Sequence, residues 1–282
     1  MKDADLYKIH LSVFLFGFAG LFGKWIHLDA ITIVWGRVLF ASIAFGFYFL
    51  WQKRNPFYLS LKMLLVYFFL GSLLAFHWWS FYKSVKLSTV AIALFSFTSF
   101  PIFTVFLEPL FFKLKWKAIY FVLAFVSMLG IYLLLPQIDL NHVYFWGVFW
   151  GVWSGFSFSV LTILNRILLK GQEAIDLAFF QDFFAFLCLS PFIIILHPSI
   201  EINHWLLLAL MGIVFTALAH FLFIKGLVSV QAQTAAIIAN LEAVYGAFFA
   251  YLLLSESLSI KNILGGLIIL LAAVFSAWYR KK

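Results

Sequence analysis

Residues 88–112 read STVAIALFSFTSFPIFTVFLEPLFF, a stretch in which Glu108 is the only charged side chain. An α-helix rises about 1.5 Å per residue, so roughly 20 apolar residues are enough to cross the hydrocarbon layer of a bilayer. This stretch has the necessary length and apolar character. It therefore predicts a transmembrane helix.

The composition of the whole chain supports the same environment. Of its 282 residues, 65% are hydrophobic, 11% are charged and 38 are Phe, and the mean hydropathy is +1.07. Soluble domains are roughly 45–50% apolar and about 25% charged. A soluble monomer of this composition would expose far more apolar surface than such proteins tolerate. The composition therefore excludes an ordinary cytosolic enzyme, a nucleic-acid-binding protein and a disordered chain.

Polar clusters divide the sequence into ten apolar stretches that each predict a membrane-spanning helix. They cover residues 9–26, 30–51, 61–83, 88–112, 117–135, 143–168, 175–196, 204–225, 230–254 and 260–279. The first lacks a clear small-x-small cleavage site, which favours a retained helix over a signal peptide. No loop between the stretches has room for a soluble catalytic domain. The sequence therefore predicts an all-α integral membrane protein with ten transmembrane helices.

Positive charges fall mainly on one side of these predicted helices. Of the 19 Lys and Arg residues, 14 lie on the side of the N-terminus, four lie on the opposite side, and Arg37 lies within a span. Lys and Arg concentrate in cytoplasmic loops. We therefore expect a multi-pass protein of the bacterial inner (plasma) membrane with both termini in the cytoplasm. The net charge of +8 then reflects this orientation and does not indicate a nucleic-acid partner.

The two halves of the chain resemble each other weakly but in the same order. An offset of 142 residues aligns Phe81-Tyr-Lys83 with Phe223-Ile-Lys225, and an offset of 144 aligns 37–41 with 181–185. Five helices per half is an odd number, so the second half must insert upside down. We expect two inverted five-helix repeats, residues 1–137 and 138–282. Inverted repeats place a substrate site near the bilayer midplane and are typical of transporters.

Three segments resemble motifs of a known family. The segment Leu241-Glu-Ala-Val-Tyr-Gly-Ala-Phe-Phe-Ala-Tyr-Leu-Leu-Leu-Ser-Glu256 resembles the ninth-span signature of the EamA family in the drug/metabolite transporter superfamily. Ala243 replaces the proline of that signature, and Ser255 replaces its glycine. Residues 35–41 resemble the arginine motif of the second span, and 81–86 resemble the end of the third. This resemblance implies a ten-helix, inverted-repeat carrier of small metabolites, commonly an exporter.

Ionisable residues within spans carry the functional expectations, because each is costly in the bilayer. Glu242, with Asn240 close by, either lines the substrate cavity, as proton acceptor or ammonium partner, or forms a structural hydrogen bond between helices. Arg37 either binds a substrate carboxylate or braces helices through Asp182 or a helix-end carbonyl. Gln181 and Asp182 are the counterparts of Arg37 under the repeat.

Aromatic and histidine residues suggest a second part of the site. His77, Trp78 and Tyr82 lie in one span and His220 in another, and the repeat pairs Trp78 with His220, so we expect these spans to face each other. Such groups suit amino acids, purines or organic cations through stacking and cation–π contacts. The alternative for Tyr82 is the aromatic belt at the membrane surface.

The span 143–168 combines a packing motif with two further site candidates. Gly147, Gly151 and Gly155 form a small-residue ridge, which predicts close helix packing. Trp153 and Ser157 project elsewhere on this helix, and we expect them to reach the cavity.

These observations predict a secondary transporter that exports an amino acid or a related amphipathic metabolite by alternating access. The sequence has no nucleotide-binding Gly-x-x-x-x-Gly-Lys-Ser/Thr motif, so a gradient, with the proton as one candidate, supplies the energy, or transport is facilitated. We expect small-molecule and lipid partners, a monomer or homodimer, and neither cofactor nor metal. The alternatives are carriers of purines, organic cations or phosphorylated metabolites, a channel, and an intramembrane enzyme.

Overall fold

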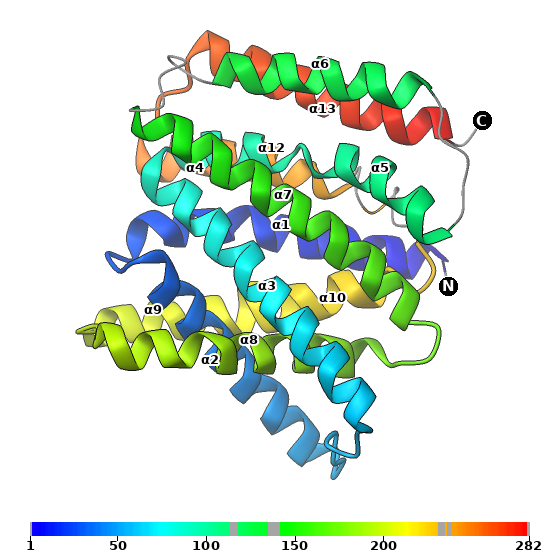
Figure 1. Cartoon of the computed structure of the whole chain (residues 1–282). Helices are drawn as coiled ribbons and strands as arrows, with labels where there is room; N and C mark the ends of the chain where they lie inside the picture. Colours follow the sequence, from blue (N-terminus) through cyan, green and yellow to red (C-terminus); the bar gives the residue numbers. More distant parts are fainter. Residues whose placement is uncertain (1, 113–117, 135–141, 231–234, 236–237, 281–282) are drawn as a thin grey trace.

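The computed structural model describes residues 2–112, 118–134, 142–230, 235 and 238–280, and all regular structure in this part of the chain is helical (Figure 1). The elements are α1 (Lys2–Trp25), α2 (Ala30–Trp51), α3 (Leu61–Leu87), α4 (Val90–Phe97), α5 (Phe100–Phe112), α6 (Ala118–Leu134), α7 (Val143–Leu168), α8 (Ala174–Leu196), α9 (Ile202–Gly212), the π-helix η1 (Ile213–Leu218), α10 (Ala219–Gly226), α12 (Leu241–Leu254) and α13 (Ile260–Arg280).

The predicted fold class, an all-α membrane protein with ten spans, is confirmed. Seven helical segments of the described chain are long and apolar enough to cross a membrane, and α6, α12 and α13 contribute three shorter apolar helices. The predicted span 88–112 consists of α4 and α5, and the span 204–225 consists of α9, η1 and α10. Parts of the predicted spans 117–135 and 230–254 lie outside the described residues. The protein is therefore a multi-pass, all-α membrane protein.

The interruption between α4 and α5 has a local chemical cause. The Thr98 hydroxyl donates to the carbonyl of Phe95 at 2.6 Å, and the Ser99 hydroxyl donates to the carbonyl of Ser96 at 2.7 Å. Such hydroxyls compete with the backbone bonds of a helix. Pro101 follows, and it has no N–H to continue the ladder. The helix therefore breaks at Thr98–Ser99, deep inside the protein, where both residues are buried.

The N-terminus of α4 is satisfied by a residue from the other half of the chain. Glu256 accepts backbone N–H groups from Val90 at 3.1 Å and Ala91 at 3.4 Å, and Thr89 caps the helix through the N–H of Ile92. The first N–H groups of a helix lack partners within it and favour a negative charge. Glu256, the last residue of the ninth-span motif, thus stabilises the start of α4.

The close packing that the sequence predicts for the glycine ridge of α7 is observed, and its partner is α4 with Ser88 just before it. A Cβ atom at Gly147 would lie 2.6 Å from Cβ of Ser88, and one at Gly151 would lie 2.6 Å from Cβ of Ser96. At Gly155 it would approach the carbonyl oxygen of Phe97 to 2.9 Å. Only glycine therefore allows α7 to come this close to α4.

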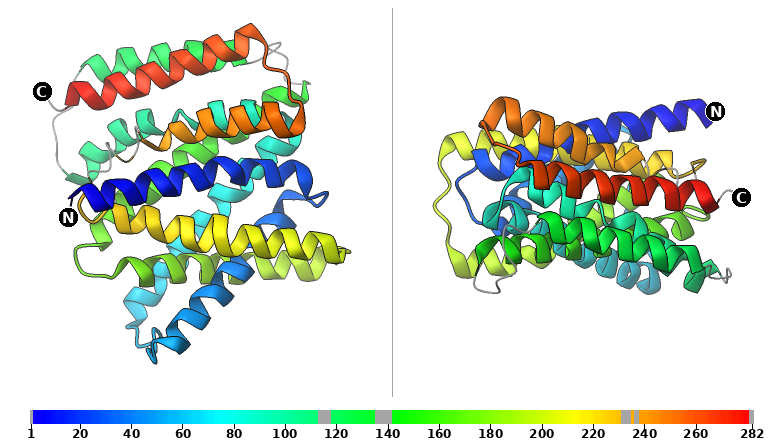
Figure 2. Two further views of the ribbon diagram at one scale, coloured as in Figure 1. Left: turned by 180° about the vertical axis from the view of Figure 1, so that it is seen from behind. Right: turned by 90° about the horizontal axis from the view of Figure 1, so that it is seen from above.

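The helices pack in a pattern that is preserved when the two halves exchange places. The contact of α3 with α7 corresponds to that of α10 with α1, the contact of α3 with α8 to that of α9 with α2, and the contact of α1 with α12 to that of α7 with α4. The last helices of the two halves, α6 and α13, lie side by side along one edge (Figures 1 and 2). This exchange pattern is that of two inverted repeats.

Candidate functional site

A buried cavity lies where helices of both halves meet. The space that protein atoms leave unfilled within its walls, including any part open to solvent, is about 580 Å³. Its wall combines aromatic rings with a few polar side chains, and the lining residues are Phe16, Ala19, Arg37, Leu74, His77, Trp78, Phe81, Phe97, Phe158, Leu161, Asn165, Gln181, His220, Phe223 and Glu242. A mostly apolar pocket with a few convergent polar groups is typical of a small-molecule site.

The cavity is nearly closed in this conformation. Only about 40 Å³ of it is open to the centres of water molecules. One water needs about 10–15 Å³ of such space, so a few waters fit and a metabolite does not. Substrate entry therefore requires the surrounding helices to move apart.

Arg37 is held by the π-helical turn η1. Its Nε donates to Oγ1 of Thr216 at 2.8 Å, and its Nη2 donates to the carbonyl of Phe215 at 3.3 Å. Its Nη1 donates to the hydroxyl of Tyr82 at 3.4 Å, and the guanidinium lies 3.9 Å from the centre of the Trp78 ring. Among the described residues no ion pair links Arg37 to Asp182. Of the roles expected for Arg37, bracing helices through a backbone carbonyl matches the observed contacts. Its side chain also lines the cavity.

Trp78 and His220 meet across the cavity, which confirms the contact expected from the repeat. Their ring centres lie 5.6 Å apart with the planes at 73°, an edge-to-face arrangement. Behind the imidazole, Nδ1 of His220 lies 3.5 Å from Oδ1 of Asp182. The side chain of Asp182 is fully buried and does not line the cavity. His220 therefore separates this carboxylate from the cavity.

His77 is fixed against α7. Its Nδ1 lies 3.0 Å from both the carbonyl oxygen and the hydroxyl of Ser154, and its ring stacks on Phe158 at 5.1 Å. The ring lines the cavity. This geometry gives His77 a defined orientation toward the space where a ligand would lie.

Glu242 lies near the start of α12 and lines the cavity with 8% of its surface accessible. No hydrogen bond or ion pair joins it to another described residue. A buried carboxylate without a partner is costly, so it calls for a proton or a cationic ligand. Glu242 is thus the wall residue best placed to receive a positive group.

Asn165 is a cavity residue that the sequence analysis did not single out. Its Oδ1 accepts a hydrogen bond of 2.6 Å from Nε2 of Gln181, and both side chains line the wall. The available signal was an amide placed deep in an otherwise apolar span. The bond leaves the Nδ2 of Asn165 available to a ligand.

Five expected site residues lie away from the cavity wall. Tyr82 is fully buried and donates to the carbonyl of Ala19 at 2.7 Å, so it braces α3 against α1 and does not belong to a surface belt. Ser157 donates to the carbonyl of Ser154 within α7. Trp153 is 41% exposed on the outside of the protein, Asn240 is buried at the start of α12, and Asp182 lies behind His220.

The model of the EamA-like transporter family matches residues 6–135 and 145–278, which together cover most of the chain. The chain belongs to the EamA-like transporter family. This places the protein among membrane transporters.

Relatives of this EamA-like protein carry the same general description. An "Uncharacterized transporter" of Archaeoglobus fulgidus is 27% identical over 154 residues, and the match spans 54% of each chain, about half the length of that relative. The "Uncharacterized transporter YxxF" of Bacillus subtilis is 24% identical over 239 residues, covering 80% of this chain and 74% of the relative. Both relatives are named as transporters and neither as an enzyme.

The fold is also found in a solved structure. A crystal structure described only as "Crystal structure of protein" aligns with a TM-score of 0.72 over 99% of this chain and 98% of the other, at 13% sequence identity. At this level of identity the similarity shows the fold alone.

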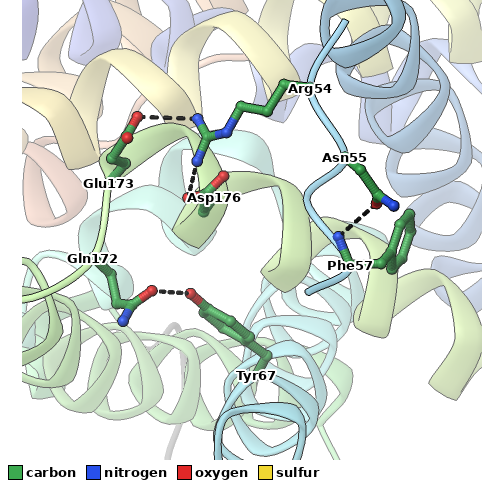
Figure 3. Close-up of polar contacts among 7 residues, drawn as sticks. All are labelled: Arg54, Asn55, Phe57, Tyr67, Gln172, Glu173 and Asp176. Carbon is green, nitrogen blue, oxygen red and sulfur yellow. Dashed lines mark hydrogen bonds and ion pairs between the residues drawn. The ribbon is translucent and has the colours of Figure 1, made fainter. Parts of the chain in front are cut away.

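Polar contacts join the two halves of this EamA-like protein at both ends of the helices. At one end, Arg54 pairs with Glu173 at 3.0 Å and Asp176 at 2.6 Å, and Tyr67 donates to Gln172 at 3.0 Å (Figure 3). We call these five residues the Arg54 cluster. At the other end, Glu256 holds the start of α4. These contacts connect the halves above and below the cavity.

Proposed function

We propose that this EamA-like protein is a secondary carrier that exports amino acids or related zwitterions by alternating access. The observation that carries the proposal is the carboxylate of Glu242, which lines the cavity without a partner among the described residues. A substrate ammonium group would neutralise it, and a charge-assisted hydrogen bond in a dry site is strong.

The carboxylate of such a substrate also has candidate hydrogen-bond donors in the cavity wall. The guanidinium of Arg37 has five N–H donors, of which three contact Thr216, Phe215 and Tyr82. Arg37 and Asn165 both line the cavity, and their remaining N–H donors are the groups that we propose for a substrate carboxylate. Phenylalanine rings of the wall, among them Phe97 and Phe158, would surround the side chain of the substrate.

A closed cavity fits the alternating-access part of the proposal. The observed space holds only a few waters, and contacts join the two halves at both ends of the helices. Opening one end at a time would admit and release substrate, with residues 1–137 and 138–282 moving as the two inverted repeats. The excess of Lys and Arg on one side supports cytoplasmic termini in a bacterial inner membrane. Export is the direction that the resemblance to the EamA family implies.

Counterflow in liposomes tests this proposal. The purified protein is reconstituted, the vesicles are loaded with an unlabelled amino acid, and entry of the same labelled amino acid is measured for each of the twenty. We expect saturable exchange of at least one of them. Glu242→Gln should reduce this exchange about tenfold or more, since one hydrogen bond to a charged group contributes about 1.5–3 kcal/mol. Glu201→Gln, at an exposed position before α9, is the matched control.

The outcome also separates substrate classes. Absence of exchange for every amino acid would refute the amino-acid proposal and leave the transporter family unaffected. Exchange of adenine or tetraethylammonium in the same vesicles would then assign a purine or an organic cation. The organic cation is disfavoured by one contact, because the guanidinium of Arg37 already covers a face of Trp78.

A further inference from the structure

Asp182 and His220 form an isolated ionisable pair beside the cavity. Asp182 is fully buried, and neither of its carboxylate oxygens has a hydrogen-bond partner among the described residues. In the part of the chain that the structure describes, its ion-pair contact is Nδ1 of His220 at 3.5 Å, and this nitrogen has no hydrogen-bond partner there. Within the described chain each group is the other's only ion-pair contact, while the charge of Arg37 also acts on Asp182.

Burial limits the charge that this pair can carry. An unpaired carboxylate away from water is costly, because neither solvent nor a donor stabilises it. The cost falls when the carboxylate takes a proton or when the neighbouring imidazole becomes an imidazolium. Either arrangement holds one proton more than a lone carboxylate beside a neutral imidazole. One proton on the pair therefore leaves neither group with an uncompensated buried charge.

The pair reaches the cavity through one of its members. His220 lines the cavity and meets the edge of Trp78, whereas Asp182 lies behind it. Water in the cavity can therefore exchange a proton with the imidazole but has no direct access to the carboxylate. This separates the pair from Glu242, whose carboxylate lies on the wall itself.

We propose that Asp182 and His220 form the proton-binding site that couples transport to a proton gradient. The inference rests on the proposed carrier function. A proton from cavity water adds to Nε2 of a neutral imidazole whose Nδ1–H faces Asp182, and the carboxylate balances the imidazolium that forms. Release to water reverses this step, and no other bond forms or breaks. Asp182 is a positioning residue, because it acts through His220.

The other ionisable groups around the pair have separate roles. On α2, Arg37 is held by Thr216, and its charge acts on Asp182 without an ion-pair contact among the described residues. On α3, His77 is fixed by Ser154, and Tyr82 donates to Ala19. On α12, Glu242 lies on the cavity wall, and the Asp, Glu, Lys and Arg residues of α1 and α8 other than Asp182 lie near the helix ends. His220 and Asp182 are thus the pair that combines cavity access with a buried counter-charge.

A comparison of two transport modes tests the coupling. Counterflow at equal pH needs no net proton movement, whereas accumulation against a gradient does. With one proton per substrate, a gradient of one pH unit supports up to about tenfold accumulation. We expect Asp182→Asn to keep counterflow of the amino acid that exchanges fastest and to lose pH-driven accumulation. His10→Gln, an exposed histidine of α1, should behave as wild type.

Two results of this comparison would overturn the proposal. One is full pH-driven accumulation by Asp182→Asn. The other is an equal loss of both modes in a protein that remains folded, since that would indicate a purely structural role. Size-exclusion chromatography of each variant before reconstitution identifies a protein that has not folded.

Nitrogen NMR supplies a readout that needs no substrate. The full chain is labelled with ring-¹⁵N histidine in lipid nanodiscs, and the signal of His220 is assigned by its absence in His220→Gln. We expect an imidazolium signal for His220 in wild type at mildly acidic pH and its loss in Asp182→Asn at the same pH. An unchanged signal in Asp182→Asn would refute the pair. If no amino acid exchanges in counterflow, the proposed function fails, while this experiment still decides whether the pair binds a proton.

Discussion

The guanidinium of Arg37 on α2 supplies hydrogen bonds to a turn of η1 that departs from α-helical geometry. Its Nε donates to the hydroxyl of Thr216 at 2.8 Å, and that hydroxyl donates in turn to the carbonyl of Met211, five residues earlier, at 2.9 Å. Its Nη2 donates to the carbonyl of Phe215. π-helical turns are often found at functional sites. Here the turn directly precedes His220 and fixes where α10 enters the cavity region.

Thr216→Val should destabilise this connection without changing the shape of the side chain. Valine fills the same space but cannot accept from Arg37, and a hydrogen bond to a charged group is worth about 1.5–3 kcal/mol. We expect a lower midpoint of thermal unfolding in detergent. Thr216→Ser keeps the hydroxyl and should unfold close to wild type. Equal midpoints for Thr216→Val and wild type would contradict the role assigned to this bond.

Gly151→Ala should destabilise the contact of α7 with α4. The added Cβ would lie 2.6 Å from Cβ of Ser96 and 3.2 Å from the carbonyl oxygen of Ala93. Neither neighbour is the end of a flexible chain, so the helices must separate, and overpacking of this kind costs about 1–3 kcal/mol.

Gly46→Ala is the matched control for this experiment. No neighbouring atom of the described residues lies within 4 Å of a Cβ at Gly46 in α2, and alanine in a helix is favoured over glycine by about 0.5–1 kcal/mol. We therefore expect opposite signs for the two glycine substitutions in the same thermal unfolding assay. A stabilising effect of Gly151→Ala would show that the ridge has spare room.

The sequence predicted the spans well because length and apolar composition alone determine which segments cross a bilayer. The break at Thr98–Ser99 was missed although Pro101 signals it, since apolar residues continue on both sides. The π turn η1 was not predictable, because its bonds come from Arg37, which lies 179 residues from Thr216 in the chain. Tertiary contacts of this kind leave no local pattern in a sequence.

Only some residues of the cavity could be predicted from the sequence. The repeat offset correctly placed Trp78 against His220, because inverted repeats bring equivalent positions together. The direction of Trp153 was not predictable, since a lipid-facing side of a helix is as apolar as its packed side. The phenylalanines of the wall were missed because 38 Phe residues give no contrast.

The stability of Glu256 variants should depend on how many oxygen acceptors remain for the backbone N–H groups of α4. Glu256→Gln keeps one oxygen for the N–H groups of Val90 and Ala91, whereas Glu256→Ala removes both acceptors. Loss of a cap costs about 0.5–2 kcal/mol. We expect unfolding midpoints in the order wild type, Glu256→Gln, Glu256→Ala. A midpoint of Glu256→Ala equal to that of wild type would show that water replaces the carboxylate.

Arg54→Gln should lower the unfolding midpoint slightly. This difference from wild type should depend on salt concentration and not on moderately alkaline pH. Partial burial opposes the charge of Arg54, but the carboxylates of Asp176 and Glu173 outweigh it and raise the pKa of Arg54 above its usual value. The stabilisation from a raised pKa is present below the unfolded-state pKa and is lost only as pH rises through the folded-state pKa. For an arginine that range lies far above neutral pH.

Arg54 is about one third exposed, so solvent screens its pairs and limits their contribution to about 0–1 kcal/mol. We expect the difference in unfolding midpoint between Arg54→Gln and wild type to shrink in high salt and to stay constant from neutral to moderately alkaline pH. Lys53→Gln removes the neighbouring charge and serves as the control. A difference that vanishes at moderately alkaline pH would rule out this assignment.

The bond between Glu256 and the N–H of Val90 spans 166 residues of sequence. During synthesis α4 therefore leaves the ribosome long before the residue that completes its first turn. Until Glu256 arrives, the leading end of α4 must be hydrated or held by the insertion machinery, because lipid offers no acceptor. The first five helices can enter the membrane early, but their final packing has to wait for almost the last helix of the chain.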